Sequence, residues 1–114
     1  DFPGNEMAAV CIVGVPFAQW NVRTKLEIRY YEKAFPKRGR LYAYIVPAIR
    51  RAAQAAGRVI RSLSDRGVII FMDQRYLLRT YNRFLPMWLR KNMKKANLKQ
   101  GKLGEQIKRF FASL

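Results

Sequence analysis

The sequence contains no histidine, and this absence excludes several kinds of active site. Without an imidazole group there is no serine–histidine triad, no histidine metal ligand and no histidine general base. The 7 Asp and Glu residues are scattered and form no evident carboxylate pair. The phosphate-cradling pattern G-x-x-x-x-G-K-[ST] is also missing. We therefore expect no metal site in this chain, and we expect that the chain alone is not a complete catalyst.

Cysteine occurs once, as Cys11, and long apolar runs are lacking. One thiol can form neither an internal disulfide nor a metal cluster, so nothing indicates a secreted scaffold, and we expect Cys11 to be a small buried hydrophobic residue. The longest apolar runs are too short to cross a membrane, and no signal-peptide pattern is visible. We expect an intracellular protein without membrane contact, in the cytoplasm or nucleoid of a prokaryote or the nucleus of a eukaryote. The loop-like start at Asp1, without methionine, predicts a piece of a longer protein.

Acidic residues are few beside 23 Lys and Arg, which gives a formal charge of +16 on 114 residues. Such an excess predicts a polyanionic partner, most often nucleic acid. The alternatives are a solubilising surface or a basic face that packs against a separate acidic domain. The candidate contacts to a DNA backbone are Lys37, Arg38, Arg40, Arg83, Lys91, Lys94 and Lys95. The aromatic residues Tyr76, Tyr81, Phe84 and Trp88 are expected to form core instead.

Two short apolar runs, residues 8–15 (AAVCIVGV) and 67–72 (GVIIFM), predict buried parallel strands. Between them, helical periodicity predicts one helix from an Asn21 N-cap to Phe35 and another over residues 41–62, kinked near Pro47. Strands that flank helices are typical of an α/β layer. Beyond the second strand, we expect Pro86 to open a helix and the chain to end in a helix with the sequence IKRFFASL.

The stretch AAQAAGRVIRS, residues 52–62, combines a small apolar helix with two arginines. On a helix, Arg58 and Arg61 lie three positions apart on one face, so both can reach one anion. Gly57 costs about 1 kcal/mol relative to alanine inside a helix, which favours close approach of another group to the backbone there. Gln54 lies near enough to complete a polar cluster. The alternative is a pair of surface arginines on an amphipathic helix, and the spacing alone favours that commoner case.

QAAGRVIRS resembles motif VI of superfamily 2 helicases, whose usual form is Q-x-x-G-R-x-x-R. The surroundings are similar to one branch, the XPD-type DNA helicases and their bacterial DinG-like relatives, in which a D-x-G turn and a buried strand follow. Here the turn is Asp65-Arg66-Gly67 and the strand is VIIFMD. Three other matches stand in the family's order: Asp1-Phe2 for the end of motif V, Asp73-Gln74-Arg75-Tyr76 for D-x-R-F/Y, and Leu85-Pro86-Met87-Trp88 for L-P-x-W.

The resemblance implies an α/β fold, the C-terminal half of a RecA-like second motor domain with parallel strands flanked by helices. Residues 1–90 would form that part, and residues 91–114 a basic C-terminal extension. The whole protein would be an ATP-dependent helicase that moves 5′ to 3′ on single-stranded DNA in DNA repair, such as nucleotide excision repair. A missing N-terminal motor domain would hold most of the ATP and Mg and carry a 4Fe-4S cluster, and a regulatory protein subunit is a further implied partner.

The resemblance also implies roles for single residues. Arg58 and Arg61 would face the γ-phosphate across a cleft and stabilise charge in the transition state. Gln54 would contact the phosphate or its attacking water, and Gly57 would belong to the same ATP-binding set. Asp1 would lie near the nucleotide and couple it to DNA.

Two functions from other classes stay open beside the helicase. One is a stand-alone basic nucleic-acid-binding module, and the other is a protein-docking domain, both without nucleotide chemistry. A Walker A lysine, a Walker B acidic pair and four cysteines in the flanking sequence would favour the helicase. We expect Arg75 to be structural, bonded near Asp73 or the sheet edge, with a contact to DNA or a partner protein as its alternative.

Overall fold

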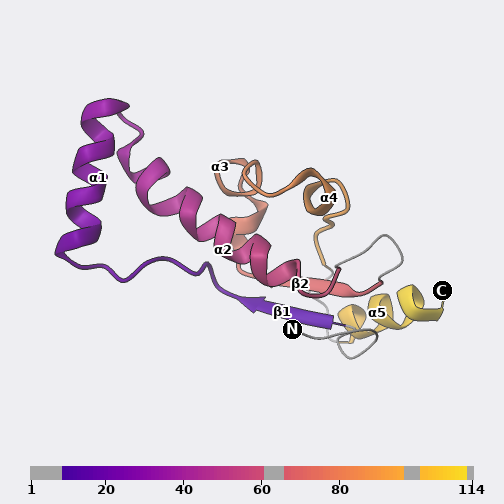
Figure 1. Ribbon diagram of the computed structural model, residues 1–114. Coiled ribbons are helices and arrows are strands. Elements are labelled where there is room, and N and C mark those ends of the chain that lie inside the picture. Colours follow the sequence, from indigo (N-terminus) through magenta and orange to yellow (C-terminus); the bar gives the residue numbers. More distant parts are fainter. Residues whose placement is uncertain (1–8, 61–65, 97–100, 113–114) are drawn as a thin grey trace.

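The computed structural model describes residues 9–60, 66–96 and 101–112, so Asp1 and Arg61 lie outside the described residues. Two parallel strands, β1 (Ala9–Val13) and β2 (Val68–Met72), lie beneath a long helical segment (Figure 1). The helical elements in chain order are α1 (Val22–Ala34), η1 (Leu41–Ile45), α2 (Val46–Ala56), η2 (Gln74–Leu77), α3 (Arg79–Asn82), α4 (Met87–Arg90) and α5 (Lys102–Ala112). Parallel strands flanked by helices confirm the predicted α/β class.

The two-stranded sheet has one packed face and one open face. Strand β1 pairs with β2 in the register Ile12↔Phe71, and these side chains pack with α2 in the hydrophobic core. Successive residues of a strand point to opposite faces, and Cys11 and Val13 on the other face are exposed. The predictions of a fully buried first strand and a buried Cys11 are therefore wrong. No described element covers that face of β1, a fact that the apolar sequence of the strand could not reveal.

Helix α1 begins where its cap was predicted. The Asn21 side chain accepts a hydrogen bond from the Thr24 backbone N–H at 3.0 Å, and the Thr24 hydroxyl donates to the Gln19 carbonyl at 2.6 Å. The helix ends at Ala34 with Phe35 as its C-cap. The predicted span from Asn21 to Phe35 is confirmed, because a side-chain acceptor at the first turn satisfies an otherwise orphaned donor.

Gly39 lets α1 pack directly against the start of the next helix. A Cβ at this buried position would lie 2.5 Å from the Ile28 carbonyl oxygen and 2.7 Å from the Glu32 backbone nitrogen. Those are backbone atoms of α1, which cannot move aside as a flexible side chain can. Only glycine therefore permits this approach of the two helices.

The second helix contains a π-helical turn just before Pro47. Val46 donates its backbone N–H to the Leu41 carbonyl, and α2 then begins with Pro47 in its first turn. Proline has no N–H to continue the α-helical pattern, and π-turns are a common cause of kinks. The hydrogen-bonding pattern therefore changes just before Pro47, close to the predicted break, but the helical segment continues through this point. The helix ends at Ala56, however, so the predicted continuation through residue 60 is wrong.

The core lies between α2 and the strands and is closed by Tyr76 from η2. Ala48, Ile49, Ala52 and Ala56 are fully buried on α2, and Tyr76 is 1% exposed. The Tyr76 hydroxyl donates to the Gly14 carbonyl at 2.8 Å and so joins η2 to the loop after β1.

The other aromatic residues predicted for the core behave differently from one another. Tyr81 and Phe84 pack against the core as expected. Trp88 is 39% exposed, which contradicts the prediction for this residue. Helix α4 is only one turn long, opens after Pro86 as predicted and turns Leu89 inward in place of Trp88.

The buried Tyr76 hydroxyl makes stability depend on pH. Burial, followed by the charge of Asp73, raises the pKa of Tyr76 to about 12. An unfolded tyrosine ionises near pH 10, so this stabilisation is complete below about pH 10 and is lost as the pH rises toward 12. Between these values the unfolding free energy of the wild type should fall more steeply than that of Tyr76→Phe, by about 1.4 kcal/mol per pH unit. Urea denaturation of both proteins at about pH 10 and about pH 11 measures the unfolding free energy, and an equal decrease in the wild type and in Tyr76→Phe would contradict the prediction.

Candidate functional site

Residues 54–58 span the C-terminal end of α2 and the turn that follows it. Gly57 is the C-cap, and its backbone N–H donates to the Ala53 carbonyl at 2.9 Å. The Arg58 and Val59 N–H groups then bond only three residues back, to Ala55 and Ala56, at 3.3 and 3.1 Å. Arg58 thus lies in a tightened turn after the helix. The α-helical spacing assumed for Arg58 and Arg61 is therefore wrong at Arg58, and Arg61 lies outside the described residues.

Small buried residues fix this turn against the sheet. Ala52 and Ala56 are fully buried, and Val59 is buried just beyond Arg58. The alanines bring α2 close to the strands because they add no side-chain length. Gln54 and Arg58 alternate with these anchors and are exposed. In the sequence AAQAAGRV, the buried apolar residues therefore anchor the backbone, and the polar side chains of Gln54 and Arg58 face solvent.

Arg58 and Gly57 are both accessible to a group from outside. Within the described residues, the Arg58 guanidinium has no hydrogen-bond or ion-pair partner. Gly57 has an ordinary helical φ of −64°, and a Cβ there would meet only the Ala53 and Gln54 carbonyl oxygens, at 3.4 and 3.5 Å. These are normal contacts, so the described part of the fold does not itself require glycine at this position.

Topology places this edge at the start of the strands. Helix α2 connects two parallel strands and runs opposite to them, so its C-terminal end lies near the beginning of β1 and β2 (Figure 1). Gln54, Gly57 and Arg58 therefore meet at the amino edge of the sheet. The carboxyl edge carries a different set of residues.

An ion pair occupies the carboxyl edge. Arg75 donates to Asp73 from Nε at 3.0 Å, from Nη2 at 2.7 Å and from its backbone N–H at 2.8 Å. The Arg75 guanidinium also lies 5.0 Å from the Phe17 ring centroid. The hydrogen bond from the Arg75 side chain is the main cause that lowers the pKa of Asp73. These contacts confirm the predicted structural role of Arg75 beside Asp73.

The predicted DNA contacts fall into two separate groups. Lys37, Arg38 and Arg40 lie between α1 and η1, and the others lie around and after α3 and α4, at a distance from α1 (Figure 1). All seven are exposed. The Arg40 guanidinium lies 5.8 Å from the Trp20 ring centroid, and the Arg83 guanidinium lies 4.7 Å from that of Phe84. The sequence did not predict the contact between Trp20 and Arg40, because nothing in the loop PFAQW indicates which residues Trp20 meets.

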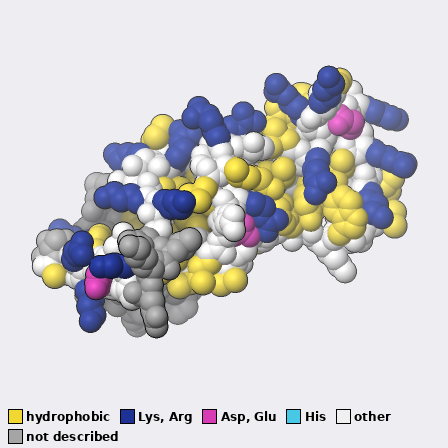
Figure 2. Space-filling model, turned by 180° about the vertical axis from the view of Figure 1, so that it is seen from behind, with side chains coloured by type: hydrophobic (Ala, Val, Ile, Leu, Met, Phe, Trp, Pro, Cys, Tyr) yellow, Lys and Arg dark blue, Asp and Glu magenta, His cyan; other side chains and the backbone are white. Residues whose placement is uncertain are grey.

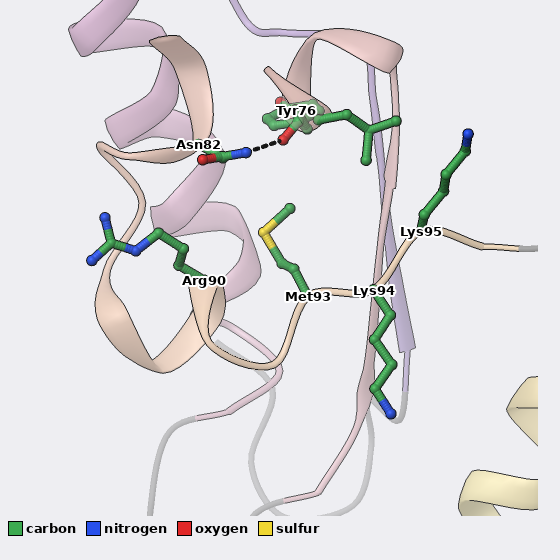
Figure 3. A pocket seen from close by; sticks show the side chains of 7 residues that line it. Tyr76, Asn82, Arg90, Met93, Lys94 and Lys95 are labelled. Atoms are coloured by element: carbon green, nitrogen blue, oxygen red, sulfur yellow. Dashed lines mark hydrogen bonds between the residues drawn. The ribbon is translucent and has the colours of Figure 1, made fainter. Parts of the chain in front are cut away.

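A shallow pocket of about 200 Å³ lies near the second group. Its lining residues are Tyr76, Leu77, Asn82, Arg90, Met93, Lys94 and Lys95. Lys94 and Lys95 extend in opposite directions, and Arg90 points away from Tyr76 (Figure 3). Arg90 also donates to the Arg83 carbonyl at 3.1 Å. These cations do not converge on one point, so the pocket is not a built anion site.

No helix in the described ranges is both long and apolar enough to span a bilayer. Among the same residues, no group of three or more Cys, Asp or Glu side chains could hold a metal ion.

The sequence matches a family described as the helicase C-terminal domain over residues 1–92. The subunit XPD of the general transcription and DNA repair factor IIH helicase from Arabidopsis thaliana is 37% identical over 101 residues, which cover 86% of this chain and 13% of that protein. The regulator of telomere elongation helicase 1 homolog of Oryza sativa subsp. japonica is 33% identical over 119 aligned residues, covering 97% of this chain and 12% of that protein.

A bacterial relative gives a similar result. The 3'-5' exonuclease DinG of Staphylococcus aureus (strain MSSA476) is 33% identical over 113 residues, which cover 96% of this chain and 12% of that protein. The chain therefore spans 12–13% of the length of these three relatives. From the family match and these relatives, we conclude that the chain belongs to the C-terminal domain family of the XPD- and DinG-type superfamily 2 helicases.

Proposed function

We propose that this chain is part of an ATP-dependent DNA helicase of the XPD type that moves 5′ to 3′ and acts in DNA repair. In this proposal, Arg58 and Arg61 supply arginine fingers to ATP hydrolysis, with Gln54, Gly57 and Asp1 near the nucleotide. The partners are single-stranded DNA, an N-terminal motor domain and a regulatory protein subunit. Family membership supports the helicase over a stand-alone basic module.

One observation carries the assignment of Arg58. Its guanidinium is exposed on a turn held by buried Ala56 and Val59, and it has no partner within the described residues. A surface arginine without a role has no need of such rigid support on both sides. A permanently charged, planar group on an anchored backbone turn suits a phosphate that approaches from another domain.

The residues of this chain fit only part of the implied cofactor chemistry. Arg58 would contact the γ-phosphate of ATP and, together with a Mg²⁺ held mainly by the other motor domain, would supply positive charge where negative charge develops during hydrolysis. Gln54, one turn earlier on α2, would orient the phosphate or the attacking water. A 4Fe-4S cluster needs four cysteine ligands, whereas the chain has Cys11 alone, so its residues do not fit the cluster.

The direct test compares ATP hydrolysis with nucleotide binding in the helicase that carries this chain. Arg58→Ala should reduce ATP hydrolysis and leave nucleotide binding largely intact. Normal hydrolysis in that variant would contradict the proposal. The 114-residue chain by itself should show no ATPase activity, since it lacks a phosphate-cradling loop.

Replacing Gly57 by alanine should lower ATP hydrolysis without lowering the stability of the chain. The Cβ has space and φ is favourable, so the unfolding free energy of the chain should stay unchanged or rise by up to about 1 kcal/mol. Hydrolysis by the helicase should fall by roughly tenfold to a hundredfold, because the methyl group displaces what approaches the backbone. Thermal unfolding and steady-state ATPase assays measure the two effects.

A matched control for this prediction lies on α5. A Cβ at Gly104 would meet no other described element within 4 Å, so Gly104→Ala, like Gly57→Ala, adds a methyl group without a clash. That variant should keep full hydrolysis. An active Gly57→Ala enzyme would show that no group approaches the backbone at this position.

A further inference from the structure

An aromatic and cationic cluster lies beyond the carboxyl edge of the sheet, where α1 meets η1. Tyr44 stacks on Phe17 with ring centroids 4.6 Å apart, and Trp20 packs edge-on against Tyr44 at 5.3 Å. Arg40 lies 5.8 Å from the Trp20 centroid and 5.7 Å from that of Tyr44, and Lys25 lies 5.9 Å from that of Trp20. Trp20 is therefore held by neighbouring rings and bordered by two cations.

The indole ring stays open to solvent. Trp20 is 52% exposed, although a large aromatic side chain is usually well buried. Hydrophobic and basic side chains alternate over the end of the molecule that carries α1 (Figure 2). Tyr30 on α1 is even more exposed, at 70%. An ordered ring that offers half of its surface to solvent is suited to stacking on another flat group.

The surrounding charge is strongly positive. Residues 20–44 contain seven Lys or Arg and two Glu. Glu27 pairs with Arg23 at 3.2 Å, and Glu32 accepts a hydrogen bond from the Lys37 backbone N–H. Both carboxylates are thus already engaged, and the other cations are available to a polyanion. Acidic proteins carry negative charge too, but they lack the stacked bases that an exposed tryptophan can bind.

We propose that Trp20, Arg40 and Lys25 form a subsite for single-stranded DNA, in which a base stacks on the indole and the cations contact adjacent phosphates. Aromatic rings within a basic groove are the usual elements of such binding. The inference rests on the proposed helicase function. The subsite is distinct from Arg58, because Arg40 and Arg58 lie at opposite ends of the helical segment, roughly 27 Å apart at 1.5 Å per residue.

The two tryptophans of the chain provide a matched fluorescence test. Trp88→Phe leaves Trp20 as the one indole that emits, and Trp20→Phe leaves Trp88 as the one indole. Titration of the 114-residue chain with oligo(dT) should quench emission strongly in Trp88→Phe and leave it nearly unchanged in Trp20→Phe, because stacking on a base quenches an indole. Both substitutions keep an aromatic ring, and circular dichroism checks that each variant folds.

The affinity for oligo(dT) and its dependence on salt distinguish the contribution of base stacking from that of phosphate contacts. Trp20→Ala should weaken oligo(dT) binding about fivefold to a hundredfold and leave the slope of log K against log [salt] unchanged. Arg40→Ala should reduce the size of that slope by about 0.7, the value for one phosphate contact on a single strand. Wild-type affinity in Trp20→Ala would overturn the proposal, as would quenching of Trp88 in place of Trp20.

Two further outcomes identify other ligands. Heparin is a polyanion without bases, and equal quenching of Trp20 by heparin would show charge binding alone and overturn the stacking site. Capture of an acidic protein at Trp20 without quenching by oligo(dT) would likewise overturn it. The ATPase assay of Arg58→Ala is independent of these titrations. If Trp20 is not quenched while Arg58→Ala loses hydrolysis, only the subsite proposal fails. If Trp20 is quenched while Arg58→Ala keeps hydrolysis, only the arginine-finger proposal fails.

Discussion

Replacing Arg58 by alanine in the helicase that carries this chain should lower ATP hydrolysis by about a thousandfold or more. The guanidinium would stabilise negative charge that grows on the γ-phosphate only in the transition state, so its loss should affect turnover far more than nucleotide affinity. Steady-state hydrolysis with saturating single-stranded DNA measures the first, and titration with a fluorescent nucleotide measures the second.

The structure supplies controls for this experiment. Arg50 is an exposed arginine on α2, before the turn that carries Arg58 and outside the motif, and Arg50→Ala should hydrolyse ATP at the wild-type rate. Arg58→Lys keeps the charge but loses the planar fork, so it should remain strongly impaired. Arg58→Ala should unfold within about 0.5 kcal/mol of the wild type, since Arg58 is exposed and unpartnered among the described residues. Equal losses in the Arg50 and Arg58 variants would contradict a specific role for Arg58.

Tyr76→Ala should destabilise the chain by about 3–5 kcal/mol. Tyr76 is the largest of the fully buried side chains among the described residues, packs against Phe71 with ring centroids 4.6 Å apart and bonds to Gly14. Truncation leaves a cavity where η2 joins the strands, and the loss is a large part of the 5–15 kcal/mol that stabilises a typical domain. Urea denaturation of the 114-residue chain, followed by far-UV circular dichroism, measures the change.

Two tyrosine variants bracket this effect. Tyr76→Phe keeps the ring and loses one hydrogen bond, so it should cost about 1 kcal/mol. Tyr30→Ala removes the same side chain from an exposed site on α1 and should cost less than about 1 kcal/mol. A Tyr76→Ala chain as stable as Tyr30→Ala would show that η2 does not close the core.

Features with local causes were predictable from the sequence. Asn21 caps α1 through its own side chain, and Pro86 and Pro47 act through their missing N–H, so each signal lies within a few residues of its effect. The end of α2 also had a local signal, because glycine commonly ends helices. Gly57 was interpreted as a glycine inside a helix, and the predicted helix was therefore too long.

Features that depend on distant neighbours were not predictable. Exposure of Cys11 depends on what covers the sheet, and no pattern within β1 reports it. In the single turn of α4, periodicity is too short to decide whether Trp88 or Leu89 points inward. Trp20 precedes α1 and Arg40 follows it, so no local pattern in the sequence reports their contact. Of the candidate site, the structure describes Gln54, Gly57 and Arg58, whereas Arg61 and Asp1 lie outside the described residues, and the roles of all five stay predictions.

The burial of α2 has a mechanical consequence. Ala48, Ile49 and Ala52 lie fully buried near the middle of the helical segment that η1 and α2 form, while Arg40 and Arg58 lie at its two exposed ends. Ala43 and Val46 toward one end and Ala56 and Val59 toward the other are buried too, so the segment is anchored along its length and not at one point. Arg40 and Arg58 therefore share one anchored base, and a ligand that displaces one of them must displace that base before the other arginine moves.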